Sequence, residues 1–362
     1  MENVEYLLAL QSINGLGPIR LKALLGYFKD SKVVWNANPQ EFLKLGIPQN
    51  VVELFKETRK KLNPEKYVES IKKSGISWIT IFEENYPKLL KEIYDPPIIL
   101  FYKGEILESD KKAIAVVGTR KMTSYGKLVT EKLTKELVSL GITIISGLAR
   151  GVDTEAHKSA ISANGRTLAV LGGGLNHIFP PENIELAKKI SSGYGAIISE
   201  FPPDHPSLPG NFPARNRIIS GLAKGVLVTE AAEDSGSLIT ARLALEQGRD
   251  VFAVPGPITS DLSKGPSSLI KNGAKLITSA PEILEELGWE GIQNYESRIM
   301  NQANLTENER KILEKLENEN KHIDDLCREL NLSAAIISAS LIKMEITGLI
   351  KNLGGGNYLK IC

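Results

Sequence analysis

Two arginines follow an aromatic residue in the segment FPARNRIISG, from Phe212 to Gly221. The segment ends a proline-rich loop that begins at Glu200, and it predicts the first turn of a short helix. The start of a helix carries a partial positive charge, so Arg215 and Arg217 are unfavourably placed there unless an external anion pairs with them. A solvated basic turn without a ligand is the alternative interpretation. Other segments must decide between the two.

The elements that would position these residues follow from the pattern between Ala113 and about Gly288, where short apolar runs alternate with helical segments. The runs are AIAVV (113–117), TIIS (143–146), TLAVL (167–171), AIIS (196–199), VLVT (226–229), VFAV (251–254) and KLIT (275–278). Such short runs flanked by glycine are typical of parallel strands that are buried on both faces. We therefore predict an α/β domain with a doubly wound, mainly parallel sheet of the extended Rossmann type.

Ligands of open α/β sheets bind outside the carboxyl ends of the strands, and the loops after the predicted strands carry the candidate residues. The residues that we expect at this rim are Gly118, Thr119, Arg120, Ser146, Gly147, Arg150, Phe212, Arg215, Asn216, Arg217, Ser235, Gly236, Ser237 and Lys264. Residues 235–237 open a helix, where small residues, free backbone N–H groups and the helix dipole favour an anion. Together with Phe179 and Tyr125, whose alternative role is core or lid packing, these residues predict a phosphate-binding groove with stacking platforms.

Different patterns flank this domain. Residues 1–62 are expected to form a helical domain of the SAM or helix-hairpin-helix kind, because a Gly-x-Gly-Pro turn precedes apolar residues at helical spacing between Ile13 and Phe28. Residues 63–110 are a connecting segment, with WITIF as a candidate strand, and the α/β domain covers 111–290. A polar linker, 291–304, leads to a winged helix over 305–362 that begins with a capping box of Thr306 and Glu309. Its expected recognition helix, the third helix of the domain, offers only one cation, Lys343, so we favour a protein contact over DNA reading there.

Several classes of protein are disfavoured. The chain lacks the G-x-x-x-x-G-K-[ST] phosphate loop, G-x-G-x-x-G after the first predicted strand, and the G-x-S-x-G elbow. His157 lies near Asp153 and Glu155, but on one helical stretch, which favours a helix-surface or helix-cap role over catalysis. The two cysteines and four scattered histidines predict no metal site and no cofactor, and they fit a reducing, cytoplasmic setting. No apolar run predicts a membrane span, and a net charge of +1 argues against coating of nucleic acid by bulk charge.

The motifs GTRKMTSYG, GLARGVDTEAH, SEFPP, FPARNRIISGLA, EAAEDSGSLITARLALEQGRDVFAVPG and LIKNGA occur in this order along the predicted α/β domain. In order and spacing they closely resemble the DNA-processing protein A (DprA or Smf) family. The flanking helical and winged-helix segments are also similar to longer members of that family. One departure is Thr119, where the family more often has serine, and this exchange keeps the hydroxyl group.

The resemblance implies a non-enzymatic protein of natural transformation and competence. It implies a cytoplasmic homodimer that binds and protects incoming single-stranded DNA and helps to load the RecA recombinase for homologous recombination. The family's DNA pocket corresponds to Arg120, to residues 212 and 215–217, and less securely to Lys264, with a backbone phosphate contact at 235–237. We expect that only one of Arg215 and Arg217 contacts DNA.

Two other functions remain as alternatives. The predicted architecture is similar to that of nucleoside-monophosphate phosphoribohydrolases, but their P-G-G-x-G-T-x-x-E motif is replaced here by EAAEDSGSLITA. A transcription regulator, with an α/β sensor and a DNA-reading winged helix, is disfavoured because the expected reading helix is poor in cations.

Overall fold

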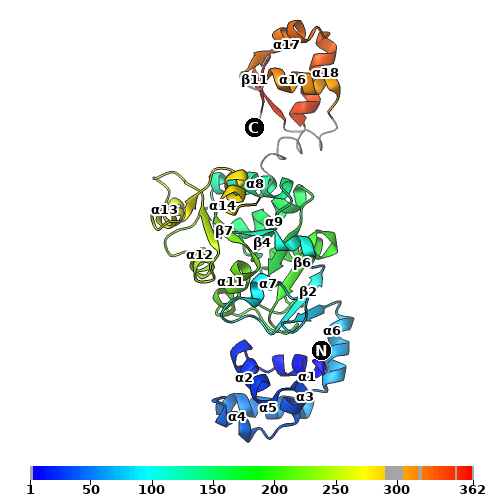
Figure 1. Cartoon of the computed structure of the whole chain (residues 1–362), viewed down its shortest axis with the longest axis vertical. Coiled ribbons are helices and arrows are strands. Elements are labelled where there is room, and N and C mark those ends of the chain that lie inside the picture. Colours follow the sequence, from blue (N-terminus) through cyan, green and yellow to red (C-terminus); the bar gives the residue numbers. More distant parts are fainter. Residues whose placement is uncertain (1–2, 290–304, 317–319, 347–348, 361–362) are drawn as a thin grey trace. The chain divides into compact units, whose positions relative to one another are not determined.

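The computed structural model describes residues 3–289, 305–316, 320–346 and 349–360. The chain divides into two compact units, Met1–Trp289 and Glu290–Cys362 (Figure 1). None of the described helices is long and apolar enough to cross a membrane.

A nine-stranded sheet organises the first unit, in the order β1-β2-β6-β5-β4-β3-β7-β8-β9. Its strands are β1 (Ser77–Thr80), β2 (Ile99–Gly104), β3 (Ala113–Val117), β4 (Thr143–Ser146), β5 (Thr167–Val170), β6 (Gly195–Ser199), β7 (Gly225–Val228), β8 (Asp250–Ala253) and β9 (Lys275–Leu276). The strands from β3 to β9 pair in parallel. The predicted doubly wound, mainly parallel sheet is confirmed.

The strand order reverses between β3 and β7. From β3 the chain builds β4, β5 and β6 on one side, and it then crosses to β7, β8 and β9 on the other. Loops that leave β3 and β7 therefore diverge over opposite faces of the sheet, and the gap between them is the switch point where ligands of such sheets bind.

Two strands come from the segment 63–110, which we expected to be a connection. Part of the run WITIF forms β1, which covers SWIT, and the extended run that ends at Gly104 forms β2. They pair with each other, and β2 pairs with β6, both antiparallel. The sheet therefore begins at Ser77, well before the boundary expected at residue 111.

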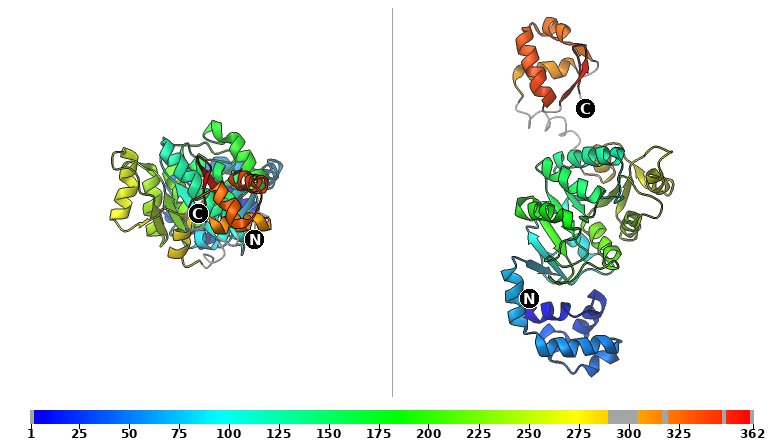
Figure 2. Two further views of the ribbon diagram at one scale, coloured as in Figure 1. Left: turned by 90° about the horizontal axis from the view of Figure 1, so that it is seen from above. Right: turned by 180° about the vertical axis from the view of Figure 1, so that it is seen from behind.

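Helices cover both faces of the sheet (Figures 1 and 2). On one face α11 (Asn211–Leu222) and α12 (Gly236–Glu246) pack on the side chains of Ala113, Ala115 and Val117. On the other face α8 (Ser124–Ser139), α9 (Val152–Ser162) and α14 (Ala280–Glu286) pack on Ile114 and Val116. This alternation along β3 is the two-residue period of a strand that is buried on both sides. The remaining elements of this region are α7 (Lys88–Lys91), η1 (Glu108–Lys111), η2 (Pro181–Asn183), α10 (Ile184–Lys189), η3 (Ile190–Tyr194), η4 (Asp261–Ser263) and α13 (Lys264–Lys271).

Six helices precede the sheet: α1 (Val4–Gln11), α2 (Pro18–Phe28), α3 (Ser31–Asn36), α4 (Gln40–Lys44), α5 (Gln49–Lys61) and α6 (Pro64–Lys73). In the turn before α2, Gly15 has a φ of +92°, and a Cβ there would lie 2.6 Å from Val51 Cγ2. One hydrophobic cluster runs from these helices to Phe101 and Ile197 of the sheet. The side chain of Gln11 also donates a 3.0 Å hydrogen bond to the carbonyl of Glu200.

The second unit contains α16 (Glu307–Lys315), α17 (Ile323–Leu330) and α18 (Ala334–Ile346), with strands β10 (Lys321–His322), β11 (Ile350–Gly354) and β12 (Asn357–Lys360). The strands form an antiparallel sheet in the order β10-β12-β11, as in a winged helix. The capping box of Thr306 and Glu309 is present at the start of α16. The cation expected on α18, Lys343, lies 2.9 Å from Glu309 of α16.

Candidate nucleic-acid interface

A pocket of about 630 Å³ opens at the switch point between β3 and β7. We call it the switch-point groove. It is formed by the loops after β3 and β7 and by the first turns of α11 and α12. The predicted site residues that line it are Gly118, Thr119, Arg120, Phe212, Arg215, Asn216, Ser235, Gly236 and Ser237. Residues far apart in the sequence are thus brought to one place.

The other five predicted site residues lie elsewhere. Gly147 and Arg150 line a small adjoining hollow, in which Arg150 also pairs with Glu182. Ser146 is buried, and its hydroxyl donates to the Val116 carbonyl. Lys264 is exposed outside the groove and lies 2.8 Å from Asp261, whereas Arg217 is buried behind the groove wall.

The positive charges of the groove lie beside the ring of Phe212. The guanidinium carbon of Arg120 lies 5.6 Å from the centroid of this ring, and that of Arg215 lies 6.0 Å away. The Phe179 ring, 5.8 Å from Phe212, adds a second aromatic surface. A guanidinium within about 6 Å of a ring centroid is favourably placed for a cation–π interaction. The exposed Arg120 and these rings can therefore meet a phosphate and a base at the same place.

Arg215 is built into the floor of the groove. Its Nη1 donates to the carbonyls of Gly147 and Val170, which lie at the ends of β4 and β5. A Cβ at position 147 would lie 2.4 Å from Arg215 Nη1, so any larger residue there would displace the guanidinium. Burial lowers the pKa of Arg215 to about 10, against the opposing effect of Asp153, so the group remains charged at neutral pH. Its Nε has no hydrogen-bond partner among the described residues.

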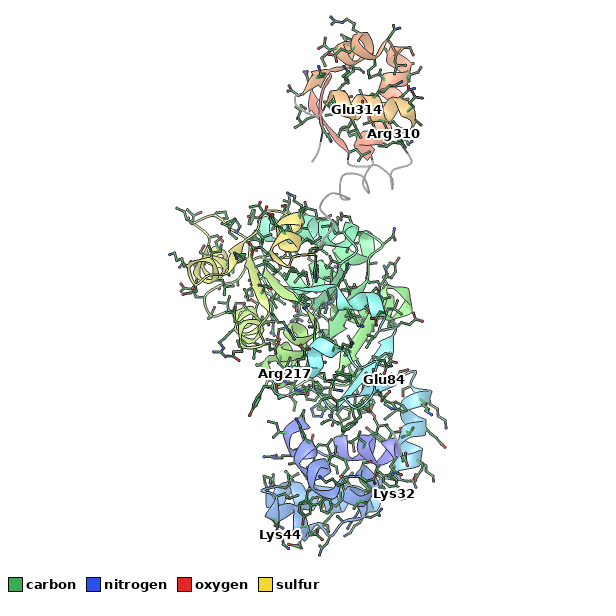
Figure 3. All side chains as sticks on the ribbon, in the orientation of Figure 1. Lys32, Lys44, Glu84, Arg217, Arg310 and Glu314 are labelled. Atoms are coloured by element: carbon green, nitrogen blue, oxygen red, sulfur yellow. The ribbon has the colours of Figure 1, made fainter. Side chains whose placement is uncertain are left out.

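Arg217 turns to the other side of α11. Its side chain donates to both carboxylate oxygens of Glu200, at 2.9 and 2.7 Å, and to Asp95 at 2.8 Å. Burial disfavours its charge, but these two carboxylates raise the pKa of Arg217 above its usual value. Figure 3 labels this side chain at the base of the sheet unit. All three of its side-chain nitrogens donate to acceptors of the protein, so it holds α11 rather than facing the groove.

The start of α12 provides the backbone donors. Ser235 is the N-cap residue, its Oγ accepts from the Ser237 backbone N–H, and the two hydroxyls lie 2.7 Å apart. The Asn216 amide of α11 donates to the Gly236 carbonyl at 3.3 Å, which connects the two helix starts. The Ser235 N–H donates to the Ala232 carbonyl, so within 235–237 the Gly236 N–H is the one without an acceptor among the described residues. This N–H and the dipole of α12 favour an anion at this end of the groove.

The Gly118–Thr119 turn brings the backbone of the β3 exit close to that of β7. Thr119 N–H donates to the Glu230 carbonyl at 2.7 Å, and the Thr119 carbonyl accepts from Val152 N–H. A Cβ on Gly118 would lie 2.6 Å from the Glu230 carbonyl oxygen. The turn therefore fixes the direction in which Arg120 leaves the sheet.

Three charged residues of the groove were not among the predicted site residues: Lys121, Asp153 and Asp234. Lys121 and Asp234 are exposed and directly adjoin predicted positions, which is the signal that would have included them. Asp153 accepts from the backbone N–H groups of Gly147 and Ala149. Burial raises the pKa of this carboxyl. His157, which we expected at a helix surface or cap, is instead fully buried and shares a 2.6 Å hydrogen bond with Thr167.

A mainly parallel α/β sheet with a basic, aromatic groove at its switch point defines a Rossmann-type ligand-binding protein. Residues 77–288 match the family model of DNA recombination-mediator protein A, and residues 298–356 match the DprA winged helix domain. The chain belongs to this family of recombination mediators, whose members are named DprA or Smf. The matched region begins at β1, in agreement with the extent of the sheet.

Relatives cover most of the chain. It is 36% identical to protein Smf of Synechocystis over 98% of both chains, and 44% identical to DNA processing protein DprA of Bacillus subtilis over 72% of this chain and 90% of that one. The X-ray structure of DprA from Streptococcus pneumoniae matches with a TM-score of 0.69 and 37% identity, over 79% of this chain and 99% of that one. DprA from Helicobacter pylori, whose structure was described for its single-stranded DNA binding mode, matches with a TM-score of 0.53 and 31% identity, over 59% and 95%.

Proposed function

We propose that the switch-point groove binds single-stranded DNA. The observation that carries this proposal is the position of Arg120 and Arg215 at the ring of Phe212, beside the anion-favouring start of α12. Binding without sequence preference requires neutralised phosphates and stacked bases, and the groove offers groups for both. The single-stranded DNA binding mode described for the Helicobacter pylori relative supports the same assignment.

We assign roles within the groove from the geometry. Arg120 and the start of α12 at 235–237 meet phosphates, with the Gly236 N–H as the backbone donor, Phe212 stacks on a base, and Asn216 and the 118–119 turn shape the wall. Of the two arginines of α11, Arg215 contacts the strand and Arg217 is a positioning residue, because only Arg215 lines the groove. Gly147 and Arg150 in the adjoining hollow extend the contact surface, and Lys264 at a neighbouring strand exit attracts the strand without lining the groove.

At the level of the whole protein, we propose a recombination mediator that acts during DNA uptake. It protects incoming single strands in the cytoplasm and helps RecA to form filaments on them, as a homodimer and without catalysing a reaction of its own. Membership of the recombination-mediator family supports this role. In the winged helix, Ile336 and Ile342 are exposed on α18, at 42% and 57%, which favours a protein contact there over DNA reading.

Fluorescence anisotropy with labelled oligothymidylate and with a duplex of equal length, at several salt concentrations, tests the proposal. We expect salt-sensitive binding that favours the single strand. RecA filament nucleation, followed in the same samples, should accelerate when the protein is present. Tighter binding of a specific duplex would instead favour a transcription regulator, and release of adenine from AMP would favour a nucleotide hydrolase.

A further inference from the structure

A second pocket, of about 380 Å³, lies at the amino ends of the parallel strands, at the opposite end from the switch-point groove. We call it the amino-edge pocket. Its floor contains Leu168, near the start of β5, and Leu222, at the end of α11. Lys224, directly before β7, lies on its rim. The pocket shares no lining residue with the switch-point groove. A ligand bound here would not occupy the proposed DNA site.

Hydrogen bonds fix the walls of the amino-edge pocket. The hydroxyl of the buried Tyr86 donates to the Pro97 carbonyl at 2.7 Å. Asp110 accepts from the Leu107 backbone N–H at 2.8 Å and from two nitrogens of Arg166 at 2.9 Å each. The pocket is therefore preformed, and its volume falls within the range of about 300–1,000 Å³ that is usual for small-molecule sites.

Two lysines of the rim are not neutralised by an ion pair within the described part of the chain. Lys111 pairs with Glu108, and Glu92 lies 3.7 Å from Arg249. Lys88 and Lys224 are exposed, and neither forms an ion pair within the described part of the chain. Against these two cations stands one unpaired carboxylate of the rim, Glu84, which Figure 3 labels.

We propose that the amino-edge pocket binds a small molecule with an apolar body and one anionic group. The apolar body would lie on Leu168 and Leu222, which form the floor. The anionic group would lie beside Lys88 and Lys224, whose charges the protein leaves unpaired. The pocket is separate from the switch-point groove, so neither the fold nor DNA binding in that groove explains why a pocket of this kind is present.

The probe for this site is 1-anilinonaphthalene-8-sulfonate, which has an apolar aromatic body, carries one sulfonate and fluoresces when it is buried. Titration of the full chain should show one saturable site. The double variant Lys88→Glu, Lys224→Glu should weaken binding at least about tenfold, because it places like charges beside the sulfonate. The matched control, Lys22→Glu with Lys44→Glu, makes the same charge change on exposed lysines of α2 and α4 and should bind as the parent does.

Energy transfer from an introduced indole locates the probe. Leu107 at the pocket and Leu208 near the switch-point groove are exposed to similar extents, 45% and 48%. We expect stronger transfer to the bound probe in L107W than in L208W. Equal weakening by the two lysine pairs, stronger transfer in L208W, or displacement of the probe by oligothymidylate would each overturn the proposal. The comparison of the lysine pairs and the energy transfer do not depend on whether the switch-point groove binds DNA.

Discussion

The guanidinium of Arg120 lies over the ring of Phe212, with 5.6 Å between the guanidinium carbon and the ring centroid. Arg120 leaves the sheet after β3, and Phe212 belongs to the first turn of α11. Neither segment alone distinguishes a binding site from a solvated turn. Their meeting at the switch point makes the proposed anion site a property of the tertiary structure, and each half of it can be tested separately.

Arg120→Ala should weaken binding to single-stranded oligonucleotides of every sequence, oligothymidylate included. It should also flatten the salt dependence of binding. Loss of one phosphate contact reduces the slope of log K against log salt by about 0.7 for single strands. Anisotropy titrations at four salt concentrations measure this slope. Arg242→Ala is the matched control, because Arg242 is a 71% exposed arginine of α12 that does not line the groove. An Arg120→Ala slope equal to that of the parent would refute the contact.

Phe212→Ala should lower affinity without changing the salt slope, because the ring carries no charge. The expected loss is about 1–3 kcal/mol per stacked base. Phe82→Ala removes the same side chain at a site that is 53% exposed and outside the groove, and it should bind as the parent does. If the two variants bind equally well, Phe212 packs against Phe179 but does not stack on DNA.

Arg217→Ala should destabilise the fold far more than Arg120→Ala. Removing one partner of a buried ion pair costs about 3–5 kcal/mol, because Glu200 would keep an uncompensated charge. An exposed substitution such as Arg120→Ala stays within about 0.5 kcal/mol. Urea unfolding followed by tryptophan fluorescence measures both, since all three tryptophans, at positions 35, 78 and 289, belong to the first unit.

Measurements of DNA binding also distinguish the role of Arg217 from that of Arg215. Arg217→Lys, where folded, should keep the salt slope of the parent, because Arg217 faces Glu200 and Asp95. A reduced slope in this variant, with normal stability, would make Arg217 the DNA contact in place of Arg215.

The stability of the first unit should fall in acid partly through His157. Burial, and then the charge of Arg215, lower the pKa of His157 to about 3, from an ordinary value of 6.5. Below pH 6.5 the unfolded chain takes up a proton that the folded chain refuses, so stability is lost as the pH falls from 6.5 towards 3. The loss approaches about 1.4 kcal/mol per pH unit.

The variant His157→Gln isolates this effect, because its side chain does not titrate. Asp153 and Glu200 have raised pKa values through burial, so both add stability as the pH falls, and both are present in parent and variant. Urea unfolding at pH 4.5, 5.5 and 7.5 should therefore show a steeper loss in the parent than in His157→Gln. Parallel curves would mean that His157 is protonated in the fold.

The sheet and the location of the groove were predictable from the sequence because both rest on local periodicity and on a general rule of strand exits. The different orientations of Arg215 and Arg217 were only partly predictable from the sequence. Residues two apart on a helix point to nearly opposite sides, so one arginine at most could face the groove. Which one depends on Glu200 and Asp95, which reach Arg217 only through the tertiary fold.

Two other features could not be inferred from local sequence. Ser146 was expected at the rim, but the pleat of β4 turns its hydroxyl to the Val116 carbonyl. The place of β1 and β2 in the sheet is set by the antiparallel pairing of β2 with β6, a partner far along the chain. Both outcomes depend on non-local contacts.

The Arg215 guanidinium has a consequence for how long the protein persists. Its Nε finds no acceptor among the described residues, and an unmet buried donor weakens a fold by about 1–3 kcal/mol. An anion that relieves this deficit in the occupied groove would raise the free energy of unfolding, since a ligand that binds only the native state stabilises it. Protein without a bound ligand would then be degraded first by proteases, and the turnover of the protein would depend on the concentration of its ligand.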